Sequence, residues 1–143
     1  MVACIVPTLT IVWAVTERFR DKDALVFYMP DHAEEIYNGA PYMYGRMHSA
    51  KINYRLAREE FEIPFWIWGS PIYRKNHPYG WKAIQAAKDR KLMTDRLAHL
   101  LLYLGGISTK HYREDLNVIS PQYDEQRPRI LKGQTDYDLV KSE

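Results

Sequence analysis

The stretch from Ala24 to Glu35, ALVFYMPDHAEE, constrains the fold of this chain most. Five apolar or aromatic residues, Leu25 to Met29, run directly into Pro30 and then into Asp31 and His32. Such a run predicts a buried strand that ends in a polar loop. Adjacent residues within a strand point to opposite faces. Asp31 and His32 can therefore serve one site only because the chain has left the strand at Pro30.

Length and composition limit what this strand can belong to. A chain of 143 residues is long enough for one domain with a core, although a parallel sheet covered on both faces usually needs more. The 20 Lys and Arg residues against 18 Asp and Glu residues leave a net charge of +2, which selects neither nucleic acid nor an anionic membrane as partner. The single cysteine, Cys4, excludes an internal disulfide and a cysteine-based metal cluster.

The first sixteen residues carry no charge, which raises the question of a membrane or export segment. A spanning helix needs about 20 apolar residues. Pro7 interrupts this segment, and neither a basic start nor a small-residue cleavage site is visible. We expect either a buried segment or a poorly determined start, with residues 1–11 atypical. Apolar residues at helical spacing predict a helix over Ile11 to Phe19, and a charged turn then leads into the strand.

Further elements follow the same α/β pattern. Ile63 to Trp68 is apolar throughout and predicts a second strand, which Gly69-Ser70-Pro71 ends. Apolar spacing predicts helices over Tyr79 to Arg90 and from Thr94 to Gly105, the second with a buried leucine face. We predict an α/β fold with a partial parallel-type sheet flanked by helices. Residues 1–143 form a single, incomplete domain, in which 108–143 are a polar tail that wraps over the body.

The segment after His32 interleaves aromatic and basic residues, and turn residues lie within it. Such a pattern can stack on and neutralise a single nucleic acid strand. A surface or active-site loop with ordinary tyrosine packing also explains this pattern, and we favour this interpretation. We therefore expect no nucleic-acid partner. The residues concerned are Tyr37, Tyr42, Tyr44, Arg46, His48 and Lys51.

Asp31 and His32 are candidate metal ligands. Open α/β sheets place their sites in loops at the carboxyl ends of strands. A carboxylate beside an imidazole, with Glu34 and Glu35 following, supplies oxygen and nitrogen ligands that suit zinc and related ions. An Asp-His dipeptide alone is weak evidence for a metal site, and motifs elsewhere in the sequence are needed to support it.

Several motifs, in order, give that context. The sequence resembles the C-terminal part of the sulfatase-like branch of the alkaline phosphatase superfamily, above all the bacterial phosphoethanolamine transferases. In that family a charged turn and a hydrophobic strand precede a Ser-Asp-His-Gly-Glu-Glu motif, which residues 18–37 resemble. The other matching motifs are a Glu-Ile-Pro-aromatic-Ile-Trp strand, a Ser-Pro-x-Tyr turn, a Thr-Asp with a leucine-rich helix, and an Arg-x-Arg element, at Glu62–Trp68, Ser70–Tyr73, Thr94–Ile107 and Arg127–Arg129.

The resemblance implies a metal-dependent activity. Family members transfer phosphoethanolamine from a phospholipid to a lipopolysaccharide sugar or lipid A, or hydrolyse sulfate esters in related branches. A divalent metal assists the displacement by neutralising charge. By position, Asp31 and His32 would be metal ligands, with zinc the expected ion and calcium the second candidate, and His48 would contact the substrate. Full-length relatives lie in the inner membrane with a periplasmic domain.

The sequence also departs from the family pattern. Ala33 stands where the family has Gly, and a positive φ there would cost on the order of 1 kcal/mol and displace His32. Pro30 replaces a Ser, and the family's nucleophile and remaining metal ligands lie in an upstream half. We therefore expect a fragment that is inactive alone. The alternative is a non-catalytic interaction module that forms a homo-oligomer or pairs with a complementary N-terminal half.

Overall fold

The chain divides into two compact units. The computed structural model describes residues 5–36, 44–45 and 51–141. Unit 1 comprises Met1–Phe27 and Ile67–Gln126, and unit 2 comprises Tyr28–Trp66 and Arg127–Glu143. Each unit is thus assembled from two segments that are distant in the sequence.

Helix α1 (Ile5–Arg18) confirms the predicted helix and begins six residues before its predicted start at Ile11. Pro7 is tolerated because it lies in the first turn, where backbone N–H groups have no intrahelical partner. The expectation of a buried segment is wrong for this helix, since Ile11 and Trp13 are each 65% exposed. Among the described residues, no helix has the length and apolar character that crossing a bilayer requires.

The two predicted strands are present and form a pair. Strand β1 (Leu25–Tyr28) lies beside β4 (Trp66–Gly69) in a two-stranded sheet. The backbone N–H of Ser70 donates to the carbonyl of Ala24 at 2.9 Å, directly beyond the ends of these strands. The second strand begins three residues after its predicted start at Ile63 and includes Gly69, which was expected to end it.

The structure shows a mixed helix and strand fold, but it does not show the predicted parallel sheet. The remaining described strands form two separate antiparallel pairs. Antiparallel strands can be joined by a short turn, whereas parallel strands need a crossover of a dozen or more residues. Only residues 132–134 join β5 to β6. The pairs are β2 (Glu35–Ile36) with β3 (Tyr44–Gly45), and β5 (Ile130–Leu131) with β6 (Thr135–Asp136).

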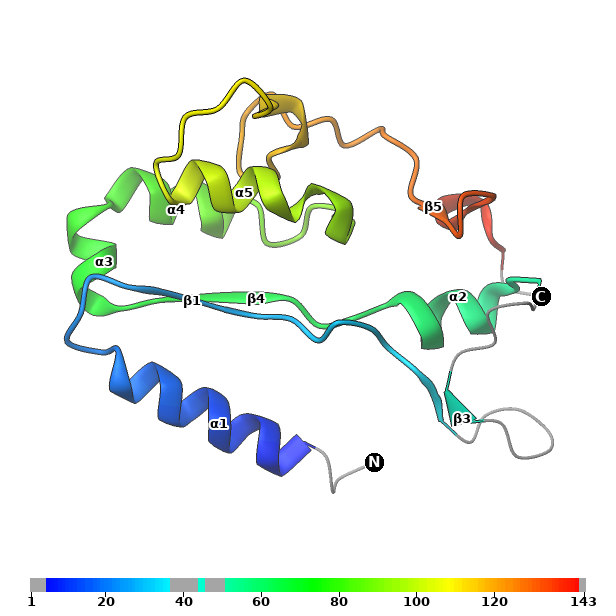
Figure 1. The fold of residues 1–143 in the computed structure, drawn as a ribbon, viewed down its shortest axis with the longest axis horizontal. Coiled ribbons are helices and arrows are strands. Elements are labelled where there is room, and N and C mark those ends of the chain that lie inside the picture. Colours follow the sequence, from blue (N-terminus) through cyan, green and yellow to red (C-terminus); the bar gives the residue numbers. More distant parts are fainter. Residues whose placement is uncertain (1–4, 37–43, 46–50, 142–143) are drawn as a thin grey trace. The chain divides into compact units, whose positions relative to one another are not determined.

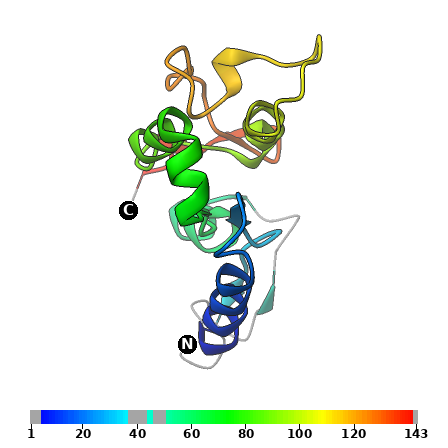
Figure 2. The same cartoon turned by 90° about the vertical axis from the view of Figure 1, so that its left-hand side faces the viewer.

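A series of short helices completes unit 1. In Figures 1 and 2, α1 lies on one side of β1, and the later helices of the unit lie on the other. Ser70 caps α3, because its side chain accepts a hydrogen bond from the backbone N–H of Tyr73 at 2.9 Å. From the sequence, only a turn is predicted at Ser70-Pro71. These helices are α3 (Pro71–Asn76), α4 (Pro78–Ala86), the 3-10 helix η1 (Thr94–Arg96) and α5 (Leu97–Leu104).

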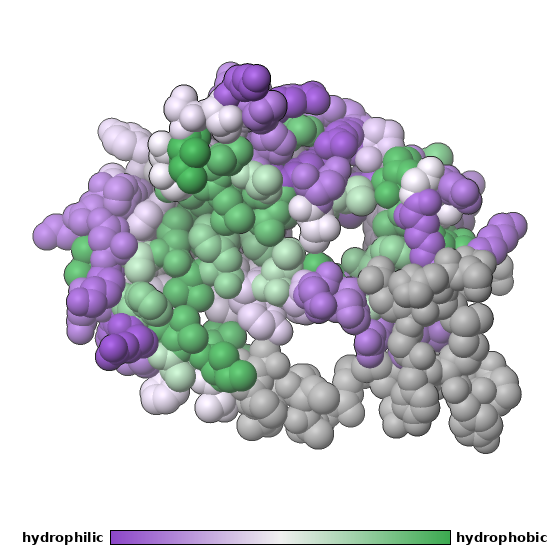
Figure 3. All heavy atoms as spheres, viewed as in Figure 1, coloured by the Kyte–Doolittle hydropathy of each residue, from purple (hydrophilic) through white to green (hydrophobic). Residues whose placement is uncertain are grey.

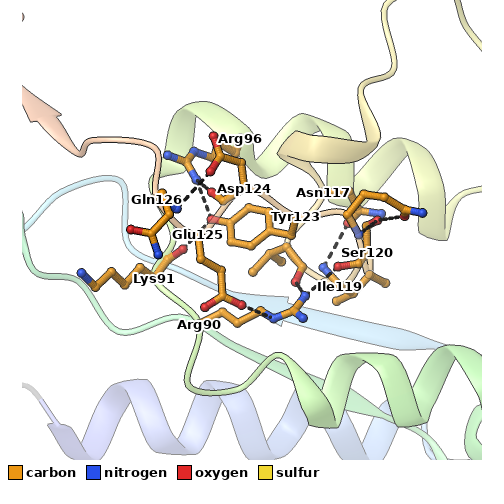
Figure 4. Close-up of polar contacts among 12 residues, drawn as sticks. Arg90, Lys91, Arg96, Asn117, Ile119, Ser120, Tyr123, Asp124, Glu125 and Gln126 are labelled. Carbon is orange, nitrogen blue, oxygen red and sulfur yellow. Dashed lines mark hydrogen bonds and ion pairs between the residues drawn. The ribbon is translucent and has the colours of Figure 1, made fainter.

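Two arginines anchor the segment that follows α5, as Figure 4 shows. Arg90 donates to the carbonyls of Val118 and Ser120 at 2.9 and 2.7 Å. The side chain of Arg96, only 2% exposed, donates to the Tyr123 hydroxyl at 2.7 Å. Burying a charged group is favourable only with such partners. The segment includes the 3-10 helix η2 (Glu114–Leu116) and contributes Leu116, Val118, Ile119 and Tyr123 to the core.

Unit 2 is built around α2 (Tyr54–Phe61). Asn53 caps this helix by accepting from the backbone N–H of Leu56 at 2.9 Å, and Leu56 and Ala57 are buried. Lys132 lies 3.9 Å from the buried carboxylate of Glu60. Next to β6, the 3-10 helix η3 (Tyr137–Leu139) completes the described part of this unit.

Candidate functional site

The predicted metal ligands lie in an accessible loop of unit 2 that follows β1. Pro30 cannot donate a ladder hydrogen bond, which favours the end of the strand at this point. The side chain of Asp31 is 89% exposed and that of His32 is 36% exposed. The loop ends at Glu35, the first residue of β2. Both candidate ligands can therefore be reached from solvent.

The two side chains approach each other. The backbone N–H of His32 donates to Asp31 Oδ1 at 3.1 Å, and His32 Nε2 lies 3.6 Å from Asp31 Oδ2. On the other edge of the ring, Nδ1 lies 3.2 Å from the carbonyl of Ala33 and 3.9 Å from Glu34 Oε1. When Nδ1 carries the proton and donates it to this carbonyl, Nε2 keeps a lone pair on the side of Asp31.

This spacing fits two ligands of one metal ion. Zinc binds imidazole nitrogen and carboxylate oxygen at about 2.0–2.1 Å, so two ligands in a tetrahedral arrangement lie roughly 3.3 Å apart. The separation of 3.6 Å between Nε2 of His32 and Oδ2 of Asp31 is close to this value. A closed structural zinc site uses four protein ligands, and a catalytic site uses three. Within residues 5–36, 44–45 and 51–141, no group of three or more His, Cys, Asp or Glu side chains is placed to hold a metal ion.

The other predicted contact, His48, lies outside the described residues. Three further histidines take structural positions in unit 1. His77 occupies the N-cap position of α4, and His99 on α5 accepts a hydrogen bond from the backbone N–H of Arg113 at 3.1 Å. His111 is exposed in the segment after α5.

Ala33 stands where the family has Gly, but its backbone does not adopt a positive φ. Among the described residues, Lys132 is the only non-glycine residue with a positive φ. Ala33 is therefore accommodated without the cost of a left-handed backbone, and its carbonyl is free to approach the His32 ring.

Glu35 anchors the end of the loop to α2, a contact that sequence analysis missed. Its carboxylate, only 4% exposed, accepts a hydrogen bond from Arg55, which also donates to Glu59 at 3.1 Å. The hydrogen bond to Glu35 is the main cause that raises the pKa of Arg55. The i, i+4 spacing of Arg55 and Glu59 could be found in the sequence. The pairing with Glu35 depends on the fold.

Comparisons with known proteins agree with the resemblance seen in the sequence. No family model matches the chain. The phosphoethanolamine transferase EptC of Escherichia coli strain RS218 is 29% identical over 126 residues, which are 84% of this chain and 20% of that protein. EptC of Escherichia coli strain K12 is 29% identical over 124 residues, which are 82% of this chain and 20% of that protein. The chain thus spans about a fifth of the length of these relatives.

Solved structures extend the similarity to the fold. The crystal structure of the C-terminal periplasmic domain of EptC from Escherichia coli matches with a TM-score of 0.68 at 24% identity, covering 92% of this chain and 37% of that one. A zinc complex of the same domain matches with a TM-score of 0.67 at 25% identity, with the same coverage. In sequence and in fold, this chain is therefore similar to the C-terminal periplasmic part of a phosphoethanolamine transferase.

Proposed function

We propose that this chain is part of a phosphoethanolamine transferase and that Asp31 and His32 bind a divalent metal ion. The observation that carries the proposal is the 3.6 Å approach of His32 Nε2 to Asp31 Oδ2. The solved zinc complex of the similar EptC domain makes zinc the first candidate, with calcium as the alternative. An imidazole ligand favours zinc, because calcium prefers oxygen ligands alone.

The proposed reaction moves phosphoethanolamine from a phospholipid to a lipopolysaccharide sugar or lipid A. Hydrolysis of a sulfate ester is the corresponding reaction in the related branch. A bound divalent metal supplies Lewis-acid stabilisation of phosphoryl oxygens. In this chain the contact of Nδ1 with the Ala33 carbonyl orients the His32 ring, and the Glu35–Arg55 pair anchors the end of the loop. His48 is the proposed substrate contact.

We further propose that the 143-residue chain alone does not turn over substrate. Asp31 and His32 supply two ligands, and a catalytic zinc site uses three protein ligands with an open position. Purified chain, supplied with zinc and a chromogenic phosphodiester or sulfate ester, is expected to show no turnover above buffer. Metal-dependent turnover that disappears in Asp31→Ala would contradict the inactivity while supporting the metal site.

Zinc binding by purified chain tests the metal ligands directly. Isothermal titration of zinc into the wild-type chain, Asp31→Ala and His32→Ala should show a site that each substitution weakens at least about tenfold, because each removes one ligand. Asp89→Ala and His111→Ala are matched controls, since both residues are exposed and neither is near the loop in sequence. Equal zinc affinity in the wild type and the Asp31 and His32 variants would remove the proposal.

A second candidate is a non-catalytic interaction module, favoured by the exposed apolar surface of α1. Leu9, Ile11 and Trp13 are 61%, 65% and 65% exposed. Apolar surface of this kind on a soluble domain commonly marks an interface. The partner would be a second copy of the chain or a complementary N-terminal half.

Light scattering tests this second candidate. The wild-type chain should form an oligomer at working concentration, and Trp13→Glu should shift it towards the monomer. Leu139→Glu is a matched control, because Leu139 is 73% exposed in unit 2 and lies outside α1. A monomeric wild-type chain over the whole concentration range would argue against self-association through α1.

A further inference from the structure

A cleft in unit 1 has the properties of a small-molecule site. It has a volume of about 490 Å³, which lies within the usual range of roughly 300–1,000 Å³ for ligand pockets. In the space-filling view of Figure 3, hydrophobic surface gathers over the region of unit 1 formed by β1 and α5. The apolar side chains that line the cleft are Leu25, Phe27, Leu101 and Leu104.

One end of the cleft is polar. Asp23 and His77 both line it, and they approach from positions 54 residues apart in the sequence. Asp23 Oδ2 accepts from Asn76 Nδ2 at 2.9 Å and lies 3.1 Å from His77 Nε2. The His77 ring stacks on the buried Tyr73 ring with centroids 4.5 Å apart. This packing holds the His77 imidazole, and with it the Asp23 carboxylate, at the polar end of the cleft.

The charge of this polar end selects the class of ligand. Among the described residues that line the cleft, Asp23 is the only acidic one, and none is Lys or Arg. The hydrogen bond from Asn76 is the main cause that lowers the pKa of Asp23, and His77 lowers this pKa further. Burial of the carboxyl group acts in the opposite direction and raises its pKa. The carboxylate is therefore ionised at neutral pH. The hydrogen bonds from Asn76 and to His77 are both made by Oδ2 of Asp23, and Asp23 itself lines the cleft.

We propose that this cleft binds a small organic amine, whose apolar body lies against Leu25, Leu101 and Leu104 and whose ammonium group pairs with Asp23. An ammonium group complements the carboxylate of Asp23 in a cleft lined by no Lys or Arg, whereas that carboxylate would repel an anionic head. The apolar body supplies affinity by removing hydrocarbon surface from water. This site uses neither Asp31 nor His32, so it stands independently of the proposed transferase activity.

The test uses three ligands of one shape and two variants of the full chain. Phenethylamine, phenethyl alcohol and phenylacetate are titrated into methyl-labelled protein, and shifts of the Leu25, Leu101 and Leu104 methyl signals report binding. Phenethylamine should bind best, by roughly fivefold or more over the alcohol, and phenylacetate worst. Asp23→Asn should reduce the preference for the amine to near unity while the alcohol still binds.

A cleft-filling variant keeps the test decisive if Asp23→Asn fails to fold. Leu101→Trp fills the cleft from a side chain that is already 43% exposed, and it should abolish binding of all three ligands. Leu139→Trp, on a residue 73% exposed in unit 2, is the matched control and should bind as the wild type does. Undiminished binding in Leu101→Trp, equal affinity for the amine and phenylacetate, or no methyl shift with any ligand would each overturn the proposal. Loss of the signals through self-association at the cleft would likewise identify a second copy of the chain, not an amine, as its occupant.

Discussion

Two adjacent leucines of α5 should respond very differently to truncation. Leu100 is 0% exposed, and Leu101 is 43% exposed at the edge of the cleft. Leu100→Ala removes fully buried methyl groups and leaves a cavity in the core, which costs about 3–5 kcal/mol in comparable sites. Leu101→Ala should lower the free energy of unfolding by roughly 1 kcal/mol, because complete burial of a leucine is worth about 1.5–3 kcal/mol and no closed cavity forms.

Urea unfolding followed by circular dichroism measures this difference. The two variants should differ by at least about 2 kcal/mol in the free energy of unfolding. Near this chain length each kcal/mol shifts Tm by about 2–4 °C, so the Tm values should differ by roughly 4–8 °C. An equal loss in the two variants, or a larger loss in Leu101→Ala, would refute the assignment of Leu100 to the core and Leu101 to the surface.

Three further predictions concern the turn before β1 and the two ends of α3. Ser70→Ala should lower the free energy of unfolding by about 1–3 kcal/mol in urea titrations. The substitution removes the cap of α3 and a hydrogen bond that the Ser70 hydroxyl donates to the Lys22 carbonyl at 2.5 Å. Ser108→Ala, at an exposed serine, is the control and should change the free energy of unfolding little. Because the folded-state pKa of Asp23 is lowered, its ionised form stabilises the fold above the unfolded pKa of about 3.9, and this contribution is lost as the pH falls through the lower folded value. Asn76→Ala should raise the pKa of Asp23 towards its ordinary value in a carboxyl NMR titration, and an unchanged pKa would contradict the cause assigned to the shift.

Local sequence patterns predicted the helices α1, α4 and α5 and the strands β1 and β4. The apolar run after Ala24 became β1, and the leucine-rich stretch became α5 with Gly105 as its C-cap. The apolar start of the chain became α1. In each case the backbone N–H and C=O groups are hydrogen-bonded within the element or to a neighbouring extended segment. The spacing of apolar residues and their intrinsic propensity therefore suffice to predict the element. Helix α3 was missed because Ser70-Pro71 is a turn signal as well as a cap followed by proline at N1.

The sequence by itself also identified Asp31 and His32 as a pair, since neighbouring residues that have left a strand can share one site. It could not determine which apolar residues are covered. The leucine face of α5 predicted Leu100 and Leu101 alike as buried, and only the tertiary structure distinguishes them. Helical spacing defines which residues share a face, but the neighbours that cover that face come from elsewhere in the chain.

Only the tertiary structure decided the long-range polar contacts. Asp23 meets His77 across 54 residues, and Arg96 meets Tyr123 across 27 residues. Neither pair has a local signature, because a charged residue with a distant partner is indistinguishable in sequence from one in solvent. The sequence alone therefore determined α1, α4, α5, the strands β1 and β4, and a candidate metal pair. The fold determined the cleft and its carboxylate, because a site made from distant segments exists only once packing brings them together.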